Sequence, residues 1–241
     1  MKTQSIKYSS VFKLAWPIFI QMILSMCLGY VDTAMMSRSS ETAVGAIGNA
    51  HQIISFLNLA FSIIASATGV VVAQYLGAKK TEEMNKIYTV SVLFNLVLSV
   101  LICLIVTIFS KNLLQAIHVP QVMFEDANSY MKIVGLFLFT DSVVMIFSQV
   151  FNCHGKTFVG MLLFFGMNVL NIIGNYCFLF GPLAYLNLGT KGVAISTSIS
   201  SICAMAVSFI IFKKIIKGKI SLQFLNPFPF DMLKKLIKLG I

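Results

Sequence analysis

The stretch Gly29-Tyr30-Val31-Asp32-Thr33-Ala34-Met35-Met36 places a single carboxylate near the end of an apolar run that begins at Leu14. A charged side chain at the centre of a bilayer costs about 2.5–3.5 kcal/mol, so such an acid usually faces a protein interior and has a function. Gln21 and Ser25 precede Asp32 by eleven and seven residues, which puts all three on one face of a helix. Asp32 also lies about 27 Å of helix rise beyond Leu14, so a simple interfacial position remains open.

The composition is that of an integral membrane protein. Hydrophobic residues make up 58% of the 241 positions and charged residues 11%, and the mean hydropathy is +0.89. A soluble domain carries about 25% charged residues. The net charge of +10 comes without a basic and aromatic groove pattern, so we expect no nucleic-acid partner.

Six apolar segments are long enough to cross a bilayer as helices. They are residues 14–36, 51–76, 87–109, 130–151, 158–180 and 192–212. The connections between them are short, so neighbouring helices should pack antiparallel in an all-α bundle. We therefore predict a six-helix transmembrane lobe over residues 1–212, followed by a cytoplasmic or interfacial linker over residues 213–235.

The basic residues predict the orientation of this bundle. Fourteen of the 18 lie in the amino-terminal tail, in the even-numbered connections or after the sixth segment, whereas the other side holds Arg38, Lys111, Lys132 and Lys191. Such a bias is typical of cytoplasmic loops. We expect a multi-pass protein of the cell membrane with a cytoplasmic amino terminus. The fourteen are Lys2, Lys7, Lys13, Lys79, Lys80, Lys86, Lys156, Lys213, Lys214, Lys217, Lys219, Lys234, Lys235 and Lys238.

The end of the chain is similar to its beginning. Residues 236–241 match residues 11–16 position for position, with Lys and Leu identical, and the earlier copy runs into Pro17 and the first segment. We expect residues 236–241 to start a seventh helix in a truncated chain. The gene should then continue with Pro and about six more spans, because transporters are commonly built from repeated bundles.

Other polar side chains mark candidate inner faces. Asn168, Asn171 and Asn175 are spaced three and four apart and share one helix face, which either lines a cavity or forms interhelical hydrogen bonds. Asp141, near the middle of the fourth segment, is a second intramembrane acid; it either carries protons or is held neutral by a neighbouring hydroxyl or amide. The cavity-lining candidates are Gln21, Ser25, Asn58 and Asn168.

Motifs for enzyme chemistry are absent from the sequence. There is no G-x-x-x-x-G-K-[ST] loop, no H-E-x-x-H and no G-x-S-x-G motif, so we expect neither an enzyme nor a bound cofactor. His51, His118 and His154 stand at segment ends, too scattered for a metal site. Polar stripes with one or two acids are instead typical of a secondary transporter.

The order and spacing of several loose motifs resemble the amino-terminal half of a multidrug and toxin extrusion (MATE) transporter. Lys13-Leu14-Ala15-Trp16-Pro17 and Val31-Asp32-Thr33-Ala34-Met35 are similar to the family's first helix. Ala73-Gln74-Tyr75-Leu76-Gly77-Ala78 resembles the end of its second helix, and His118-Val119-Pro120 with Ala127 and Tyr130 resembles the lead into its fourth. Residues 171–181 and 192–197 resemble its fifth and sixth helices.

The resemblance implies one lobe of a twelve-helix, two-lobe antiporter that exports drugs, toxins or organic cations in exchange for H⁺ or Na⁺. Its partners would be the lipid bilayer, cationic or amphipathic small molecules, and a missing second lobe from the same gene or a second copy. Its cation site would fall on Asp32, Asn171, Asn175 and Thr197. Many members have an acid where this chain has Asn175, so Asp32 is the one matching carboxylate, which favours protons.

Two other functions remain open. A lipid-linked polysaccharide flippase of the wider superfamily would need Arg or Lys in its cavity for phosphate groups, and none lies deep in the six segments. The chain could also be a non-functional isolated half-transporter, whose polar faces lack a partner lobe.

Overall fold

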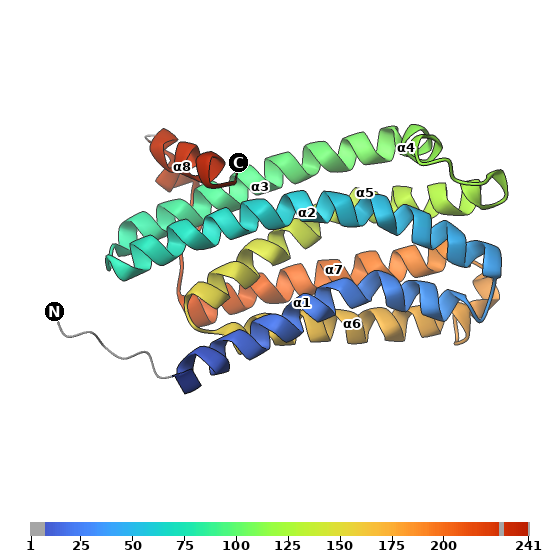
Figure 1. The fold of residues 1–241 in the computed structure, drawn as a ribbon, viewed down its shortest axis with the longest axis horizontal. Coiled ribbons are helices and arrows are strands. Elements are labelled where there is room, and N and C mark those ends of the chain that lie inside the picture. Colours follow the sequence, from blue (N-terminus) through green and yellow to red (C-terminus); the bar gives the residue numbers. More distant parts are fainter. Residues whose placement is uncertain (1–7, 227–228, 241) are drawn as a thin grey trace.

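The computed structural model describes residues 8–226 and 229–240, and within them it confirms an all-helical bundle with six helices long and apolar enough to cross a membrane. These are α1 (Tyr8–Met36), α2 (Glu41–Gly77), α3 (Thr81–Ile108), α5 (Gln121–Cys153), α6 (Thr157–Leu179) and α7 (Thr190–Ile211). A short helix, α4 (Ser110–Ala116), joins α3 to α5, and α8 (Phe230–Gly240) follows α7 (Figure 1).

Two helices begin well before the apolar segments that predicted them. Helix α2 starts at Glu41, where the Ser40 side chain accepts a hydrogen bond from the Ala43 amide at 3.3 Å. Helix α5 starts at Gln121, directly after Pro120. The first turns of both helices are polar, so hydropathy alone placed their starts at residues 51 and 130. His51 and Tyr130 therefore lie inside helices, several turns from the helix starts.

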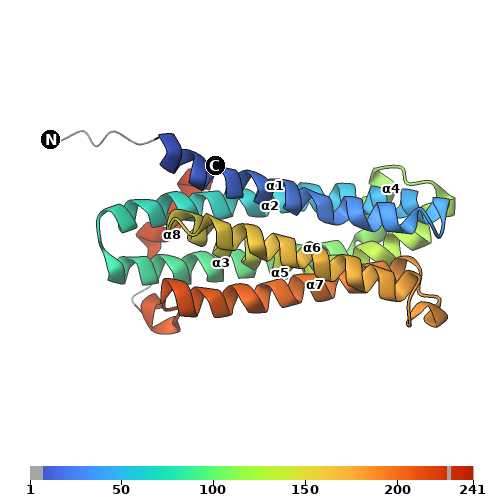
Figure 2. The ribbon, with the colours of Figure 1, turned by 90° about the horizontal axis from the view of Figure 1, so that it is seen from below.

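The connections alternate between the two ends of the bundle (Figures 1 and 2). The start of α1, the α2–α3 and α5–α6 connections and the segment after α7 lie at one end. The α1–α2 turn, α4 and the α6–α7 connection lie at the other. The lysine-rich connections thus gather at one end of the molecule. That this end faces the cytoplasm stays a prediction.

Helix α5 is the centre of the bundle, because it packs against α2, α3, α6 and α7. In the most apolar 18-residue stretch of α5, 61% of the residues are buried, whereas the corresponding stretch of α1 has 11% buried. Helix α1 packs mainly along α6, with smaller contacts to α2 and α7. It is therefore the peripheral span among those described, and moving it would disturb the least packed surface.

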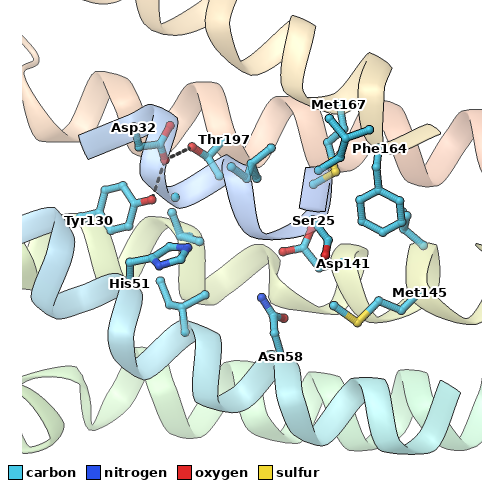
Figure 3. Close-up of a pocket in the computed structure, with 16 residues that line it drawn as sticks. Ser25, Asp32, His51, Asn58, Tyr130, Asp141, Met145, Phe164, Met167 and Thr197 are labelled. Carbon is cyan, nitrogen blue, oxygen red and sulfur yellow. Dashed lines mark hydrogen bonds between the residues drawn. The ribbon is translucent and has the colours of Figure 1, made fainter. Parts of the chain in front are cut away.

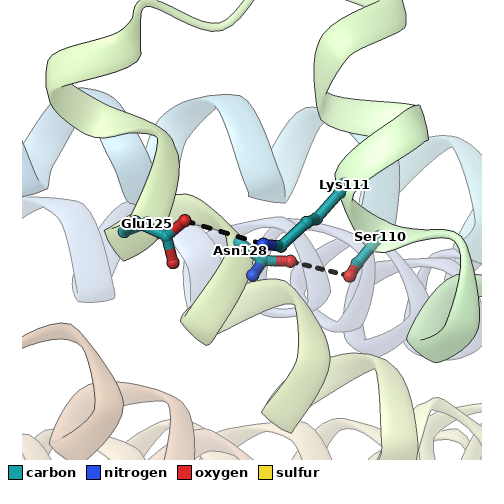
Figure 4. A network of polar contacts seen from close by, with 4 residues as sticks. All are labelled: Ser110, Lys111, Glu125 and Asn128. Carbon is teal, nitrogen blue, oxygen red and sulfur yellow. Dashed lines mark hydrogen bonds and ion pairs between the residues drawn. The ribbon is translucent and has the colours of Figure 1, made fainter.

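Helix α4 is packed onto α5 at the end that holds the α1–α2 turn (Figure 4). The buried Ser110 hydroxyl donates a hydrogen bond to Asn128 Oδ1 at 2.7 Å. Beside it Lys111 Nζ lies 3.8 Å from Glu125 Oε1. Because both side chains are exposed, this ion pair contributes little to the stability of the fold. The sequence offered no apolar run here from which to predict a helix.

The predicted linker over residues 213–235 is partly helical where the structure describes it. Residues 212–216 form a π-helical turn, residues 222–225 a 3₁₀ turn, and α8 begins at Phe230 within the predicted linker. Met232 and Leu236 of α8 are buried in the cluster that includes Val71, Tyr88 and Phe151. Lys2, Lys7, Pro227 and Ile241, the last residue of the predicted repeat, lie outside the described residues.

Gly135 allows α5 to approach α3 closely, which gives a test of the packing. A Cβ atom there would lie 2.7 Å from Val106 Cγ1, whereas one at Gly48 of α2 would meet nothing within 4 Å. We expect Gly135→Leu to lower the free energy of unfolding by about 1–3 kcal/mol through overpacking. Thermal unfolding in detergent measures this loss of stability, with Gly48→Leu as the control. Equal effects of the two changes would contradict the close contact between α3 and α5 at Gly135.

Candidate functional site

A cavity with a volume of about 50 Å³ lies between α1, α2, α5, α6 and α7 (Figure 3). Among the described residues that line it are two carboxylates, Asp32 and Asp141, and one histidine, His51, but no Lys or Arg. The cavity is therefore negatively charged whenever both acids are ionised. Its other lining residues are Leu24, Ser25, Leu28, Gly29, Ile54, Asn58, Tyr130, Val134, Val144, Met145, Phe164, Met167 and Thr197.

Four neutral donors from three helices converge on the Asp32 carboxylate. Tyr130 of α5 and Thr197 of α7 donate their hydroxyl hydrogens to Oδ2, both at 2.7 Å. Asn171 and Asn175 of α6 donate from Nδ2 to Oδ1, at 2.9 and 2.7 Å. Hydrogen bonds to an ionised acceptor are about twice as strong as neutral ones, so this set of donors fits the charged carboxylate.

Asp32 is fully buried, so it faces the protein interior and not the membrane interface. Its position four residues before the end of α1 had left both possibilities open. Because its partners come from α5, α6 and α7, one side chain ties the peripheral first helix to the rest of the bundle.

The partners of Asp32 are also bonded to one another. Asn171 and Asn175, one turn apart on α6, share a hydrogen bond of 3.3 Å from Asn175 Nδ2 to Asn171 Oδ1. Asn171 Nδ2 also lies 3.0 Å from Thr197 Oγ1. The Thr197 hydroxyl has a second acceptor in the Val193 carbonyl oxygen, at 3.0 Å. The structure thus brings together the four residues that the resemblance assigned to a cation site.

Sequence reasoning missed Tyr130 and His51 as site residues, because each is the first residue of a predicted apolar segment and was therefore placed at a helix end. Tyr130 is 1% exposed and bonds Asp32. The His51 ring packs against Gly29 of α1, near the Tyr30 ring at a centroid distance of 6.4 Å, and its Nδ1 atom pairs with the Ser55 hydroxyl at 3.1 Å. A helical projection extended back to residues 41 and 121 would have placed both side chains inside helices.

Asp141, Ser25 and Asn58 line the cavity, away from the Asp32 end (Figure 3). Two other candidates, Gln21 and Asn168, do not. Asn168 Nδ2 donates to the Leu24 carbonyl oxygen at 2.9 Å, which joins α6 to α1. Gln21 Oε1 accepts from Asn152 Nδ2 at 3.3 Å. These two amides face helix contacts, because the rotation of α1 and α6 turns them away from the cavity.

In the part of the chain that the structure describes, no group of three or more His, Cys, Asp or Glu side chains could hold a metal ion together. Asp32 is bonded to hydroxyls and amides, and Asp141 stands apart from it. A buried carboxylate in such a setting can take up and release a proton.

Residues 17–177 match the MatE family model. The chain belongs to the MATE family of membrane transporters. It is 34% identical to the uncharacterized transporter YisQ of Bacillus subtilis over 241 residues, which are 100% of this chain and 53% of YisQ. It is 23% identical to the probable multidrug resistance protein NorM of Bacillus cereus over 198 residues, or 82% of this chain and 44% of that protein.

The fold agrees with this assignment. A crystal structure of the Vibrio cholerae MATE transporter VcmN in its bent form superposes with a TM-score of 0.84 and 22% identity, covering 95% of this chain and 51% of VcmN. The chain therefore spans about half the length of the MATE proteins it matches, as expected for one lobe. Members of this family are transporters and not enzymes.

The contact between His51 and Gly29 gives a prediction for the first helix. A Cβ atom on residue 29 would overlap the His51 ring, so Gly29→Ala should destabilise the chain by about 1–3 kcal/mol. Removing the ring with His51→Ala should restore most of that loss, which makes the two changes non-additive. Unfolding of both single variants and the double variant measures the coupling; additive effects would show that the ring does not pack there.

Proposed function

We propose that the chain is the cation-binding lobe of an antiporter that exports drugs, toxins or organic cations across the cytoplasmic membrane in exchange for H⁺ or Na⁺. The observation that carries this proposal is the buried Asp32 carboxylate, which is held by four neutral donors and lies in a cavity lined by no described Lys or Arg. The charge of this lining suits substrates and ions of positive charge.

Coupling follows from what a proton does to the bonds of Asp32. Protonation removes the charge that strengthens all four hydrogen bonds and adds a donor where four donors already converge. Thr197 can adapt, because its hydroxyl can donate to the Val193 carbonyl and accept from Asp32. Asn171 and Asn175 present Nδ2 donors to Oδ1 and gain nothing from the new proton. The protonated state therefore holds α1 less firmly.

A change in α1 alters the cavity, since Leu24, Ser25, Leu28 and Gly29 of this helix line it. The cargo would bind the conformation in which Asp32 is ionised, and the proton would stabilise the rearranged conformation. The transporter would then bind either the cargo or the proton, but not both together. Such exchange needs a difference in affinity between the two conformations. Asp32 is the one carboxylate in its network, and this favours a proton over Na⁺ as the coupling ion.

The relatives support a drug or toxin cargo, because NorM of Bacillus cereus is described as a probable multidrug resistance protein. A flippase for lipid-linked polysaccharide is the second candidate, but it would place Arg or Lys against the phosphates of its cargo, and the described lining has neither. An isolated half-transporter without activity is the third. In our proposal the full transporter adds a second lobe, from the same gene or a second copy.

Asp32→Asn tests the coupling role. In proteoliposomes that hold the two-lobe transporter, we expect this change to abolish the dependence of cationic dye transport on the pH gradient. The amide keeps the shape of the side chain but cannot take up a proton in the relevant range. Glu125→Gln, at an exposed acid on α5, is the matched control. Transport by the Asp32→Asn variant that still responds to the pH gradient would refute the coupling role.

Asn175→Asp tests the choice of ion. The new carboxylate would lie beside Asp32, whose Oδ1 is 2.7 Å from Asn175 Nδ2. Two like charges at this distance repel, so a cation should bind between them more tightly. We expect Na⁺ to stimulate transport more in this variant than in the wild type, as measured by dye flux at fixed pH with and without Na⁺. An unchanged Na⁺ response would show that residue 175 does not set ion selectivity.

A further inference from the structure

We propose that Asp141 and Asn58 form a separate anchor for the protonated amine of the cargo, at the end of the cavity away from Asp32. The proposal deepens the export function above and rests on it. Tyr130 marks the Asp32 end of α5, and Asp141 follows it by eleven residues, or about 16 Å of helix rise. Figure 3 shows Asp141, Asn58 and Ser25 gathered there, apart from the Asp32 network.

The two acids of the cavity differ in their hydrogen bonding. Asp32 already accepts four hydrogen bonds. Asp141 Oδ1 is buried without a hydrogen-bond partner among the described residues. A buried carboxylate without sufficient donors is unfavourable. Asp141 therefore has capacity for a cation with N–H donors, which Asp32 lacks.

The side chains around Asp141 offer further acceptors. Asn58 Oδ1 is also buried without a partner among the described residues. The Ser25 hydroxyl uses its hydrogen on the Met22 carbonyl, at 2.7 Å, which leaves its oxygen free to accept. A primary ammonium group carries three N–H donors, so one such group could serve these acceptors together. Small shifts of the side chains would be needed to expose both Oδ1 atoms.

The walls beside these acceptors suit an aromatic or aliphatic body attached to the amine. Met145 of α5 and Phe164 and Met167 of α6 line the cavity there (Figure 3). Thioether sulfurs pack well against aromatic rings, and a phenyl face attracts cations. A bound proton would neutralise Asp141, but it would make no contact with Asn58 or with the apolar side chains of Met145, Phe164 and Met167. The chemistry of the lining thus suits an amphipathic amine better than a bare ion, and the cavity, at about 50 Å³, has to widen to admit one.

A charged and a neutral form of one probe test the anchor. Dansylcadaverine carries a protonated primary amine on an aromatic body, and its N-acetyl derivative lacks the charge. Equilibrium binding of both is measured by fluorescence on the full chain in lipid nanodiscs. We expect the wild type to bind the amine at least about tenfold more tightly, the scale of one charge-assisted hydrogen bond. Asp141→Asn should bring the ratio of the two affinities close to one.

Glu125→Gln removes one negative charge from the exposed face of the same helix and should keep the ratio. Asn58→Leu removes one acceptor but no charge and should lower the ratio partly, which preserves the test if Asp141→Asn does not fold. An equal affinity of the wild type for both probes would overturn the proposal. So would a loss of preference in Asp32→Asn with the ratio intact in Asp141→Asn. Either result leaves the pH-coupled transport at Asp32 standing, because that is measured separately.

Discussion

One buried carboxylate joins the first helix to the rest of the bundle through four neutral hydrogen-bond donors. Asp32 stands on the most exposed of the spans described, and its carboxylate accepts hydrogen bonds from Tyr130, Asn171, Asn175 and Thr197. In an apolar interior an ion without donors would be very unfavourable. The four donors remove most of that cost, but only while the carboxylate is charged. In our proposal the protonation state of this one residue sets how firmly α1 is attached.

In our proposal the rest of the lobe stays rigid while this attachment changes. Helix α5 is the central element, and its apolar residues belong to the core clusters that it shares with α2, α3, α6 and α7. Helix α1 contributes few residues to these clusters, among them Met36. It also contains Pro17, which removes a backbone hydrogen bond within the helix. A change at Asp32 can thus move α1 without unpacking the core.

Much of this could be predicted from the sequence, and the remainder depended on contacts between helices. Long apolar runs predict six spans, and the spacing of Asn171 and Asn175 predicts one shared face. Hydropathy could not find the polar first turns of α2 and α5, so it placed His51 and Tyr130 at the ends of segments. Nor could spacing separate Asn58, which lines the cavity, from Asn168, which bonds the Leu24 carbonyl. That difference depends on how each helix is rotated in the bundle.

The central claim is that Asp32 changes its protonation state inside the lobe and that its hydrogen bonds change with it. Infrared difference spectroscopy of the chain in lipid bilayers, recorded as the pH is lowered, observes this directly. The account predicts a protonated-carboxyl band that appears on acidification, together with changes in the amide bands of asparagine side chains, and that is missing in Asp32→Asn. A carboxyl band that persists unchanged in Asp32→Asn, or no band in the wild type at any pH at which the chain stays folded, would contradict the account.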